Sequence, residues 1–324
     1  MSGLVVKNSN ELWFNNNKLS TSTGTKGLYI DNQRNLFFNN AKIAVGNLSN
    51  PKGLHLINGE LAFDGNKLVS GSSTIISSLY TNNEQGFAYD FNDLSSMFQD
   101  TAGTIPVTTV GQSVARVLDK SGRGNHLIQS TLASRPILRQ NTTTNAYYLE
   151  FDGVNDFLVS SATIDFSTKN EVTLFAGLRK LSDAALGMVM ELSPTTIGNN
   201  GALYMTAPNG TTGNLAFGSK GTSLVSAQTL NEFAAPISGV FYGYANIATP
   251  ICRSYFNAGV MRTITNSQGT GNYGNHLLYI GRRGGASLPF AGHLYSLVVT
   301  SRAMTTDEQS SVKNLIAKNV GVTL

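Results

Sequence analysis

The chain has 324 residues, of which 33 are glycine, 8 are proline and one is cysteine; 41% are hydrophobic and only 13% are charged. This composition excludes a disordered chain, and no stretch approaches the roughly 20 apolar residues that a membrane-spanning helix needs. Asn, Ser, Thr and Gly supply most of the polarity, which favours turns and short strands and indicates an all-β protein. The 23 basic residues are scattered and the net charge is only +4, so neither nucleic acid nor membrane is an expected partner.

Neutral polar surfaces of this kind are typical of proteins that work outside cells. The first residues, from Met1 to Asn8, show no basic segment followed by an apolar one, so no secretory signal is predicted. The single cysteine, Cys252, excludes an intramolecular disulfide framework and is expected to be a buried, small hydrophobic residue. These observations favour a component of a virus particle that is assembled in the host cytoplasm and released by lysis.

The first 71 residues contain three similar repeats. They begin at Gly3, Gly27 and Gly53, which are 24 and 26 residues apart. Each repeat predicts a strand, a turn, a second strand, a second turn and a third strand. The same turn position holds a pair that tolerates tight hairpin geometry, namely Asn15-Asn16, Asn39-Asn40 and Asp64-Gly65.

A repeat of this size buries its apolar face by stacking on its neighbours, and about three repeats are the usual minimum. We therefore expect residues 1–71 to be an anchoring and oligomerisation domain. A homotrimer is the favoured assembly, and a small monomeric β-domain is the alternative. Trp13, Phe37 and Ala62 hold equivalent positions in the three repeats. The residues expected to mediate self-association are Trp13, Phe14, Phe37, Phe38 and Phe63.

Residues 72–78 are rich in serine and glycine and are expected to be a linker to a single domain at residues 79–324. Short stretches of alternating apolar and polar residues recur in this domain. Tyr147, Leu149 and Phe151, for example, share one face of a predicted strand. Further strands are predicted at 157–159, 171–178, 187–192, 201–206, 236–245, 251–257, 277–281 and 293–300.

One short helix is predicted near the end of the chain. Thr305 and Glu308 have the spacing of a capping box, which marks the start of a helix. Val312, Leu315 and Ile316 then form an apolar stripe that should lie against the strands. Many short strands and a single C-terminal helix indicate a jelly-roll β-sandwich.

Three segments of this domain resemble a known family. Residues 149–159 (LEFDGVNDFLV) are similar to the FDGxxDyv hairpin of laminin G-like, concanavalin A-like lectin/glucanase domains. Residues 119–126 (DKSGRGNH) resemble the glycine loop of that family, and residues 278–281 and 290–308 resemble its closing segment. The resemblance covers about residues 80–324 and implies a concanavalin A-like sandwich. Behind N-terminal β-repeats, this arrangement resembles bacteriophage virion proteins of the tail, fibre or capsid-decoration type.

Hydrolysis of a glycosidic bond requires two carboxyl groups placed across that bond. Retaining enzymes of the resembled family carry a Glu-x-Asp-x-(x)-Glu strand. The nearest match here is Glu150 with Asp152, and no second glutamate follows them. The four histidines lack the spacing of a zinc site. The protein is therefore not expected to be an enzyme.

No cofactor is expected apart from a possible calcium ion, which the resembled fold often carries. The candidate ligands are loop oxygen donors, the ligand type that calcium prefers: Asp119, Asn125, Asp152, Asn155 and Asp156. The favoured alternative is that these side chains cap turns by accepting hydrogen bonds from backbone amides.

A carbohydrate site requires an exposed aromatic ring with polar side chains beside it. Tyr273 lies in the glycine-flanked segment 269–276 and is expected to be exposed, next to Asn272. Arg282 and Arg283 lie one predicted strand away and could join them. The alternative is that this segment is a structural loop or a contact between subunits.

Taken together, the sequence predicts a structural component of a phage particle, located in the virion. The N-terminal repeats would anchor it to itself and to other virion proteins, and the sandwich would project outward. The first alternative is a tail-fibre lectin that recognises a host surface glycan. The second alternative, a glycan hydrolase, lacks the required carboxylate pair.

Overall fold

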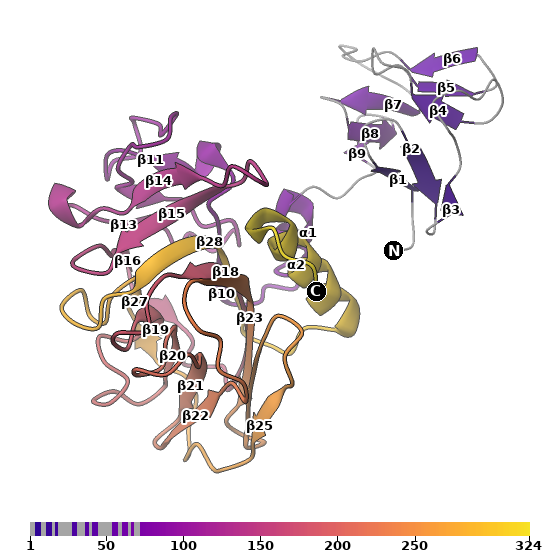
Figure 1. Ribbon diagram of the computed structural model, residues 1–324. Coiled ribbons are helices and arrows are strands. Elements are labelled where there is room, and N and C mark those ends of the chain that lie inside the picture. Colours follow the sequence, from indigo (N-terminus) through magenta and orange to yellow (C-terminus); the bar gives the residue numbers. More distant parts are fainter. Residues whose placement is uncertain are drawn as a thin grey trace. The chain divides into compact units, whose positions relative to one another are not determined.

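The structure is a computed structural model, which describes residues 72–324 continuously, with side chains from residue 75, and nine strands within the first 71 residues. The chain divides into two compact units, Met1–Thr74 and Ile75–Leu324 (Figure 1). We call the first the repeat unit and the second the sandwich, and describe each by itself. No helix among the described residues is long and apolar enough to cross a membrane.

The repeat unit contains three antiparallel sheets of three strands each. Trp13, Phe37 and Ala62 lie in the middle strands, each paired with a lysine of the third strand, which confirms the predicted equivalence of the repeats. Consecutive sheets touch through β2 and β4 and through β6 and β7. The side chains predicted to mediate self-association lie outside the described residues, so the trimer stays a prediction. The strands are β1 (Leu4–Lys7), β2 (Glu11–Phe14), β3 (Asn17–Lys18), β4 (Leu28–Ile30), β5 (Leu36–Phe38), β6 (Ala41–Ala44), β7 (Leu54–Ile57), β8 (Glu60–Phe63) and β9 (Asn66–Lys67).

The segment expected to be a Ser/Gly-rich linker forms a short helix, α1 (Ser72–Ser78). Ile76 and Leu79 are each only 1% exposed and belong to a buried cluster that they share with the C-terminal helix. Burial of these apolar side chains explains why the segment is helical although serine is a weak helix former.

The sandwich consists of two large antiparallel sheets (Figure 1). The first sheet has the order β14-β15-β28-β18-β23-β24-β25, with β10 also paired to β28, and the second has the order β11-β12-β13-β16-β27-β19-β20-β21-β22. The first sheet contains β10 (Gly86–Asp90), β14 (Ile137–Gln140), β15 (Tyr147–Asp152), β18 (Glu171–Lys180), β23 (Ile237–Asn246), β24 (Ile251–Phe256), β25 (Arg262–Ile264) and β28 (Ala291–Thr300). The second contains β11 (Met97–Phe98), β12 (Arg116–Val117), β13 (Leu127–Ile128), β16 (Leu158–Ser160), β19 (Met188–Leu192), β20 (Ala202–Thr206), β21 (Ala216–Lys220), β22 (Leu224–Gln228) and β27 (Leu278–Ile280). A small additional sheet pairs β17 (Ile164–Asp165) with β26 (Asn275–His276).

The main core lies between the two large sheets, and strand alternation explains it. Leu174 and Ala176 of β18 point into this core, whereas Phe175 points to the opposite face of the first sheet. Every strand predicted in this domain is present within a few residues of its predicted bounds. Cys252 is buried as expected, and burial raises the pKa of its thiol to about 12.

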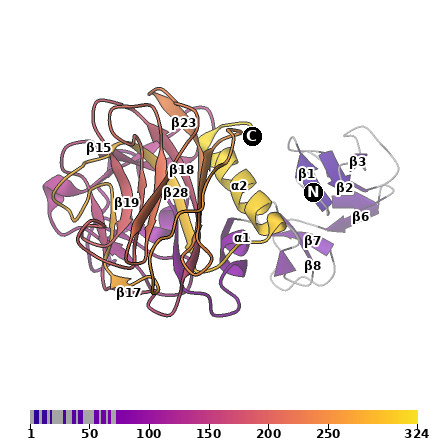
Figure 2. The same cartoon turned by 90° about the horizontal axis from the view of Figure 1, so that it is seen from below.

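Helix α2 (Thr306–Val320) covers the outer face of the first sheet, beside β18 and β28 (Figure 2). The predicted capping box is present, since Thr305 accepts a hydrogen bond from the backbone amide of Glu308 and the Glu308 side chain accepts one from that of Thr305. Val312 and Ile316 are buried against the sheet. The fold is therefore the predicted all-β sandwich with a short C-terminal helix.

Candidate functional site

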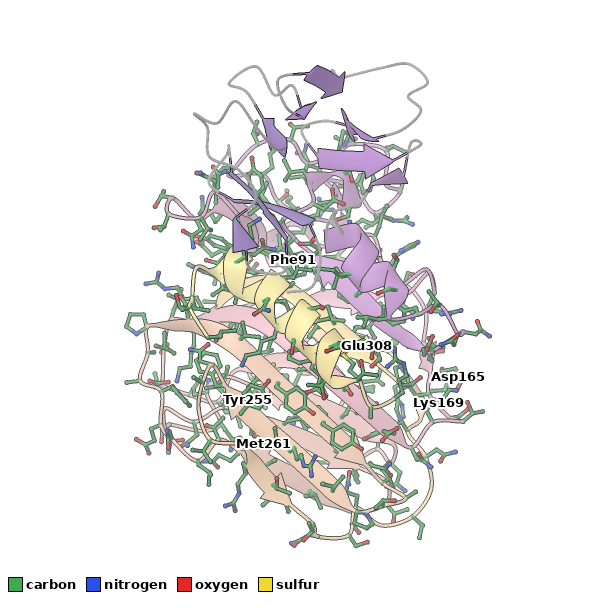
Figure 3. All side chains as sticks on the ribbon, turned by 90° about the vertical axis from the view of Figure 1, so that its right-hand side faces the viewer. Phe91, Asp165, Lys169, Tyr255, Met261 and Glu308 are labelled. Carbon is green, nitrogen blue, oxygen red and sulfur yellow. The ribbon has the colours of Figure 1, made fainter. Side chains whose placement is uncertain are left out.

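A polar cleft of about 310 Å³ lies at one edge of the sandwich. Three segments that are distant in sequence form it: the loop before β10, the glycine loop at residues 119–126, and the end of β17 with the stretch that leads to β18. Figure 3 shows Asp165 and Lys169 next to one another at this edge. Its lining residues are Asn83, Gln85, Arg123, Asp165, Thr168 and Lys169.

The glycine loop is fixed by one carboxylate. Asp119 accepts hydrogen bonds from the backbone amides of Ala88 at 2.9 Å and Asn125 at 3.0 Å, and from the amide of Ser121 at 2.9 Å. The backbone amide of Asp119 in turn donates to Nδ1 of His126 at 3.0 Å. These hydrogen bonds fix the conformation of the loop from within, and a loop that is already formed loses less entropy when it binds a ligand.

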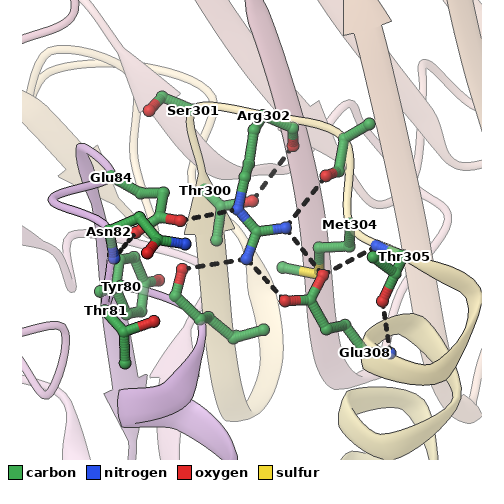
Figure 4. Close-up of polar contacts among 12 residues, drawn as sticks. Tyr80, Thr81, Asn82, Glu84, Thr300, Ser301, Arg302, Met304, Thr305 and Glu308 are labelled. Atoms are coloured by element: carbon green, nitrogen blue, oxygen red, sulfur yellow. Dashed lines mark hydrogen bonds and ion pairs between the residues drawn. The ribbon is translucent and has the colours of Figure 1, made fainter.

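Arg123 connects the glycine loop to the second wall of the cleft. Its guanidinium donates to the carbonyl of Tyr80 at 2.9 Å and also to the side-chain oxygen of Asn83. Asn83 itself has a φ of +65°, a left-handed conformation that asparagine tolerates better than most residues. The neighbouring Glu84 is anchored by Arg302, with 3.1 Å between Nε and Oε1 (Figure 4). Arg123 on one side and Arg302 on the other therefore hold the loop of residues 80–84 in place.

The third wall contributes opposite charges. Asp165 accepts hydrogen bonds from the side chain of Ser167 and, at 2.8 Å, from the backbone amide of Ser167. These hydrogen bonds hold the pKa of Asp165 below its ordinary value. Lys169 makes no hydrogen bond or ion pair through its ammonium group with any residue from 75 onward. Among residues 75–324, the cleft therefore offers one cation without a partner, Lys169, one carboxylate, Asp165, and the side-chain amides of Asn83 and Gln85.

This lining suits a ligand with many hydroxyl groups, because amide, hydroxyl and charged side chains can each donate to or accept from a hydroxyl. The lining supplies one carboxylate, Asp165, whereas glycoside hydrolysis uses two. At 310 Å³ its volume falls at the lower end of small-molecule sites, which run from about 300 to 1,000 Å³.

The structure corrects the expectation that Tyr273 is an exposed stacking platform. Its side chain is 1% exposed, and its hydroxyl lies 2.7 Å from the hydroxyl of Ser219. Backbone hydrogen bonds pin the segment to the sandwich, from Tyr273 to Lys169 and from Gly274 to Gly201, and the ring turns into the core. Asn272 donates its side-chain amide to the Ser167 carbonyl at 2.7 Å.

Arg282 and Arg283 also have internal partners. Nε of Arg283 lies 2.8 Å from a carboxylate oxygen of Glu191, a fully buried side chain. Arg282 donates to the carbonyl of Ala286 at 2.9 Å. The predicted carbohydrate site is thus not assembled around Tyr273, because its aromatic ring is inaccessible.

The calcium candidates lie in two separate loops. Asp119 and Asn125 belong to the glycine loop, and the other three lie at the end of β15 and in the turn that follows it. There, one oxygen of Asp152 accepts hydrogen bonds from the amides of Val154, Asn155 and Asp156 at 2.8, 3.1 and 3.3 Å. Asp119 in the glycine loop and Asp152 at the end of β15 therefore cap turns by accepting hydrogen bonds from backbone amides. Within the described part of the chain, no three His, Cys, Asp or Glu side chains are grouped to hold a metal ion.

Asp119 and Asn125 of the glycine loop were predicted from the sequence as possible ligands, whereas the lining residues of the cleft were not predicted. Arg123 belongs to the glycine-loop motif at residues 119–126, so this motif could have pointed to the cleft. Lys169 and Gln85 belong to segments without a motif, and only the tertiary fold brings them to the same cleft.

A scan against protein-family models and a search of curated proteins find no match for this chain. Among solved structures, the chain is similar to a GH54 α-L-arabinofuranosidase soaked with 4-nitrophenyl α-L-arabinofuranoside, at 14% identity and a TM-score of 0.53. The match covers 75% of this chain and 65% of that chain, just under two thirds of the enzyme's length. A SAP-like pentraxin from Limulus polyphemus matches at 17% identity and a TM-score of 0.40, over 51% of this chain and 80% of that chain. The botulinum neurotoxin serotype D binding domain matches at 9% identity and a TM-score of 0.48, over 71% and 51% of the two chains.

Structural similarity at such low sequence identity shows the fold alone and leaves the function open. The sandwich has a jelly-roll β-sandwich fold, as the resemblance of the hairpin, the glycine loop and the closing segment implied. The location in a phage particle stays a prediction.

Proposed function

We propose that this protein is a non-catalytic adhesion protein of a phage particle, in which the sandwich binds a glycan and the repeat unit provides assembly. The observation that carries the proposal is the polar cleft at the edge of a lectin-like sandwich. Its hydrogen-bonding side chains come from loops that are already fixed by internal contacts, as expected of a binding site that is largely formed in advance.

Two features support binding rather than hydrolysis. The cleft is lined by one carboxylate, Asp165, so a second carboxyl group to complete an acid and base pair is missing from its lining. Asp165 is held in its charged form, with its pKa below the ordinary range because Ser167 donates hydrogen bonds to it. A carboxylate of this kind is suited to accept hydrogen bonds from sugar hydroxyls, whereas a general acid needs a raised pKa.

The assembly role rests on the repeat unit and on the composition. Three short sheets in a row, each touching the next, form a small unit that gains stability by packing against copies of itself. A charge-poor surface rich in asparagine and threonine is consistent with a particle exterior. Sedimentation of the full chain tests this: a trimer supports the assembly role, and a monomer at all concentrations overturns it.

Glycan binding is tested with the full chain on a glycan array, followed by titration calorimetry of the strongest hit. Lys169→Ala removes a cation that has no hydrogen-bond or ion-pair partner among residues 75–324, so we expect at least about tenfold weaker binding with an unchanged melting temperature. Lys318→Ala, which removes an exposed lysine of α2, is the matched control and should bind like the wild type. Absence of any glycan hit, or equal binding by both variants, would contradict the proposal, and release of new reducing ends would contradict its non-catalytic part.

A further inference from the structure

A second group of polar side chains lies on the outer face of the first sheet, away from the residues that line the cleft. Glu150 of β15 pairs in register with His293 of β28, and His293 pairs with Arg179 of β18. Arg139 and Tyr148 lie one step further along β14 and β15. These residues alternate with leucines that point into the main core, so their side chains point away from it. We call the five residues the Arg179 cluster.

Most polar groups of the cluster are already in contact with one another. The Tyr148 ring stacks on the His293 ring, with 4.2 Å between centroids and 19° between planes. Arg139 forms two contacts with the Glu150 carboxylate, at 3.2 and 3.3 Å, and Nε2 of His293 lies 4.0 Å from the same carboxylate. Glu150 is thereby neutralised by Arg139.

Arg179 is the exception in this cluster. Among residues 75–324 its guanidinium has no hydrogen-bond acceptor and no carboxylate within 4.0 Å, and its Nε is buried without a partner. Nδ1 of the adjacent His293 is likewise buried and unpartnered. A partly buried guanidinium normally pairs with a carboxylate or a carbonyl, because leaving it unpaired forfeits hydration without replacement.

We propose that the Arg179 cluster is a second binding site that takes the carboxylate of an acidic sugar. Two arginines and one glutamate give the cluster a net charge of +1 with neutral His293, and a single carboxylate balances that charge. A doubly charged phosphate would overcompensate it and face repulsion from Glu150. Tyr148 and Glu150 supply a hydroxyl and an acceptor for the hydroxyl groups of the sugar.

The titratable groups that face His293 give this site a spectroscopic reporter. Burial, together with Arg179 and Arg139, lowers the pKa of His293 to about 4, although Glu150 acts in the opposite direction. The Tyr148 ring stacks on the His293 ring, and Tyr295 packs against Tyr148. An anion bound at Arg179 would offset the effect of that guanidinium, so the pKa of His293 should rise when the ligand binds. Tracking the His293 ring signals by NMR during a pH titration measures this directly.

The experiment titrates the full chain with glucuronate, glucose and acetate in parallel. We expect glucuronate to bind, acetate to bind at least about tenfold more weakly because it lacks hydroxyls, and glucose to show no binding at the same concentrations. Arg179→Gln should weaken glucuronate binding by about 10- to 100-fold, the effect of losing a charge-assisted pair, and Arg179→Lys should restore part of it. Lys169→Ala should leave glucuronate binding at this site unchanged.

Arg253→Gln is the matched control. Arg253 lies on the same face of the first sheet, and its guanidinium makes no hydrogen bond with residues 75–324. Its Cζ atom lies 5.8 Å from the centre of the Tyr244 ring. This variant should bind glucuronate like the wild type. The proposal is overturned if glucuronate does not bind or leaves the His293 signals unchanged, or if Arg179→Gln folds and binds normally. Equal affinity for acetate and glucuronate would overturn its sugar component.

Discussion

The Arg302 guanidinium and the Glu308 carboxylate form a two-point ion pair, with Nη1 at 2.7 Å from Oε2 and Nη2 at 2.6 Å from Oε1 (Figure 4). The same guanidinium reaches the buried Glu84 through Nε and the Leu79 carbonyl through Nη2. One side chain therefore links the start of α2 to the loop that forms a wall of the cleft. This arrangement connects the stability of the helix to the shape of the proposed glycan site.

Replacing Arg302 should destabilise the sandwich and loosen the cleft at once. Arg302→Gln leaves Glu84 without its cation in a largely buried position, so we expect a loss of about 2–3 kcal/mol in the free energy of unfolding. Arg262 of β25 makes no side-chain hydrogen bond or ion pair with residues 75–324, so Arg262→Gln should change the free energy of unfolding by less than about 0.5 kcal/mol. Urea unfolding measures both. Equal stability of the two variants would show that the Arg302 network contributes nothing.

Asp156 should make the protein less stable as the pH rises. Burial, and then the nearby Asp152 and Glu150 carboxylates, raise the pKa of Asp156 to about 6, although the amide of Asp152 donates a hydrogen bond to it. In an unfolded chain the pKa is about 3.9, so between about pH 4 and 6 the folded state binds more protons and stability falls with rising pH. The decline continues through the folded-state pKa and levels off about one pH unit above it, near pH 7.

Asp156→Asn removes that ionisation while its side-chain oxygen can still accept from the Asp152 amide. We expect the variant to be about 1–2 kcal/mol more stable than the wild type at pH 7 and about equally stable at pH 4. Urea unfolding at several pH values between 4 and 7 measures the difference. Glu232→Gln, which removes an exposed carboxylate, should show no such pH dependence. A constant difference between Asp156→Asn and the wild type over this range would refute the assignment.

Much of the sandwich could be predicted because its strands alternate or carry turn residues at their ends. The strands β10, β14 and β22 were not predicted, and neither was β21, whose small residues Ala216, Gly218 and Ser219 leave no apolar alternation to detect. At Gly218 an added Cβ would lie 2.1 Å from the Tyr204 ring, so a tertiary contact and not a turn selects glycine there. The α1 segment was expected to be a linker because its serines dominate the composition, yet burial of Ile76 and Leu79 decides its conformation.

The candidate site was harder to predict than the fold. The glycine loop was identified by its motif, and its Asp119 indeed organises the loop around backbone amides. Lys169 has no neighbouring pattern that marks it, and its position depends on how the chain between β17 and β18 packs. The local sequence around Tyr273 resembles an exposed loop, whereas the tertiary fold buries the Tyr273 ring and brings its hydroxyl to that of Ser219, 54 residues away in sequence.

Tyr273 should therefore contribute to stability and not to ligand binding. Tyr273→Phe keeps the ring but leaves the buried Ser219 hydroxyl without its partner, so we expect a loss of about 1–2 kcal/mol; Tyr273→Ala also leaves a cavity and should lose about 3–5 kcal/mol. Ser219→Ala combined with Tyr273→Phe should be less destabilised than the sum of the single variants, because the double variant leaves no unpaired hydroxyl. Urea unfolding of the four proteins measures this coupling. Glycan binding per folded molecule should be the same in all of them. Weaker binding by Tyr273→Phe at unchanged stability would show that Tyr273 contributes to ligand binding.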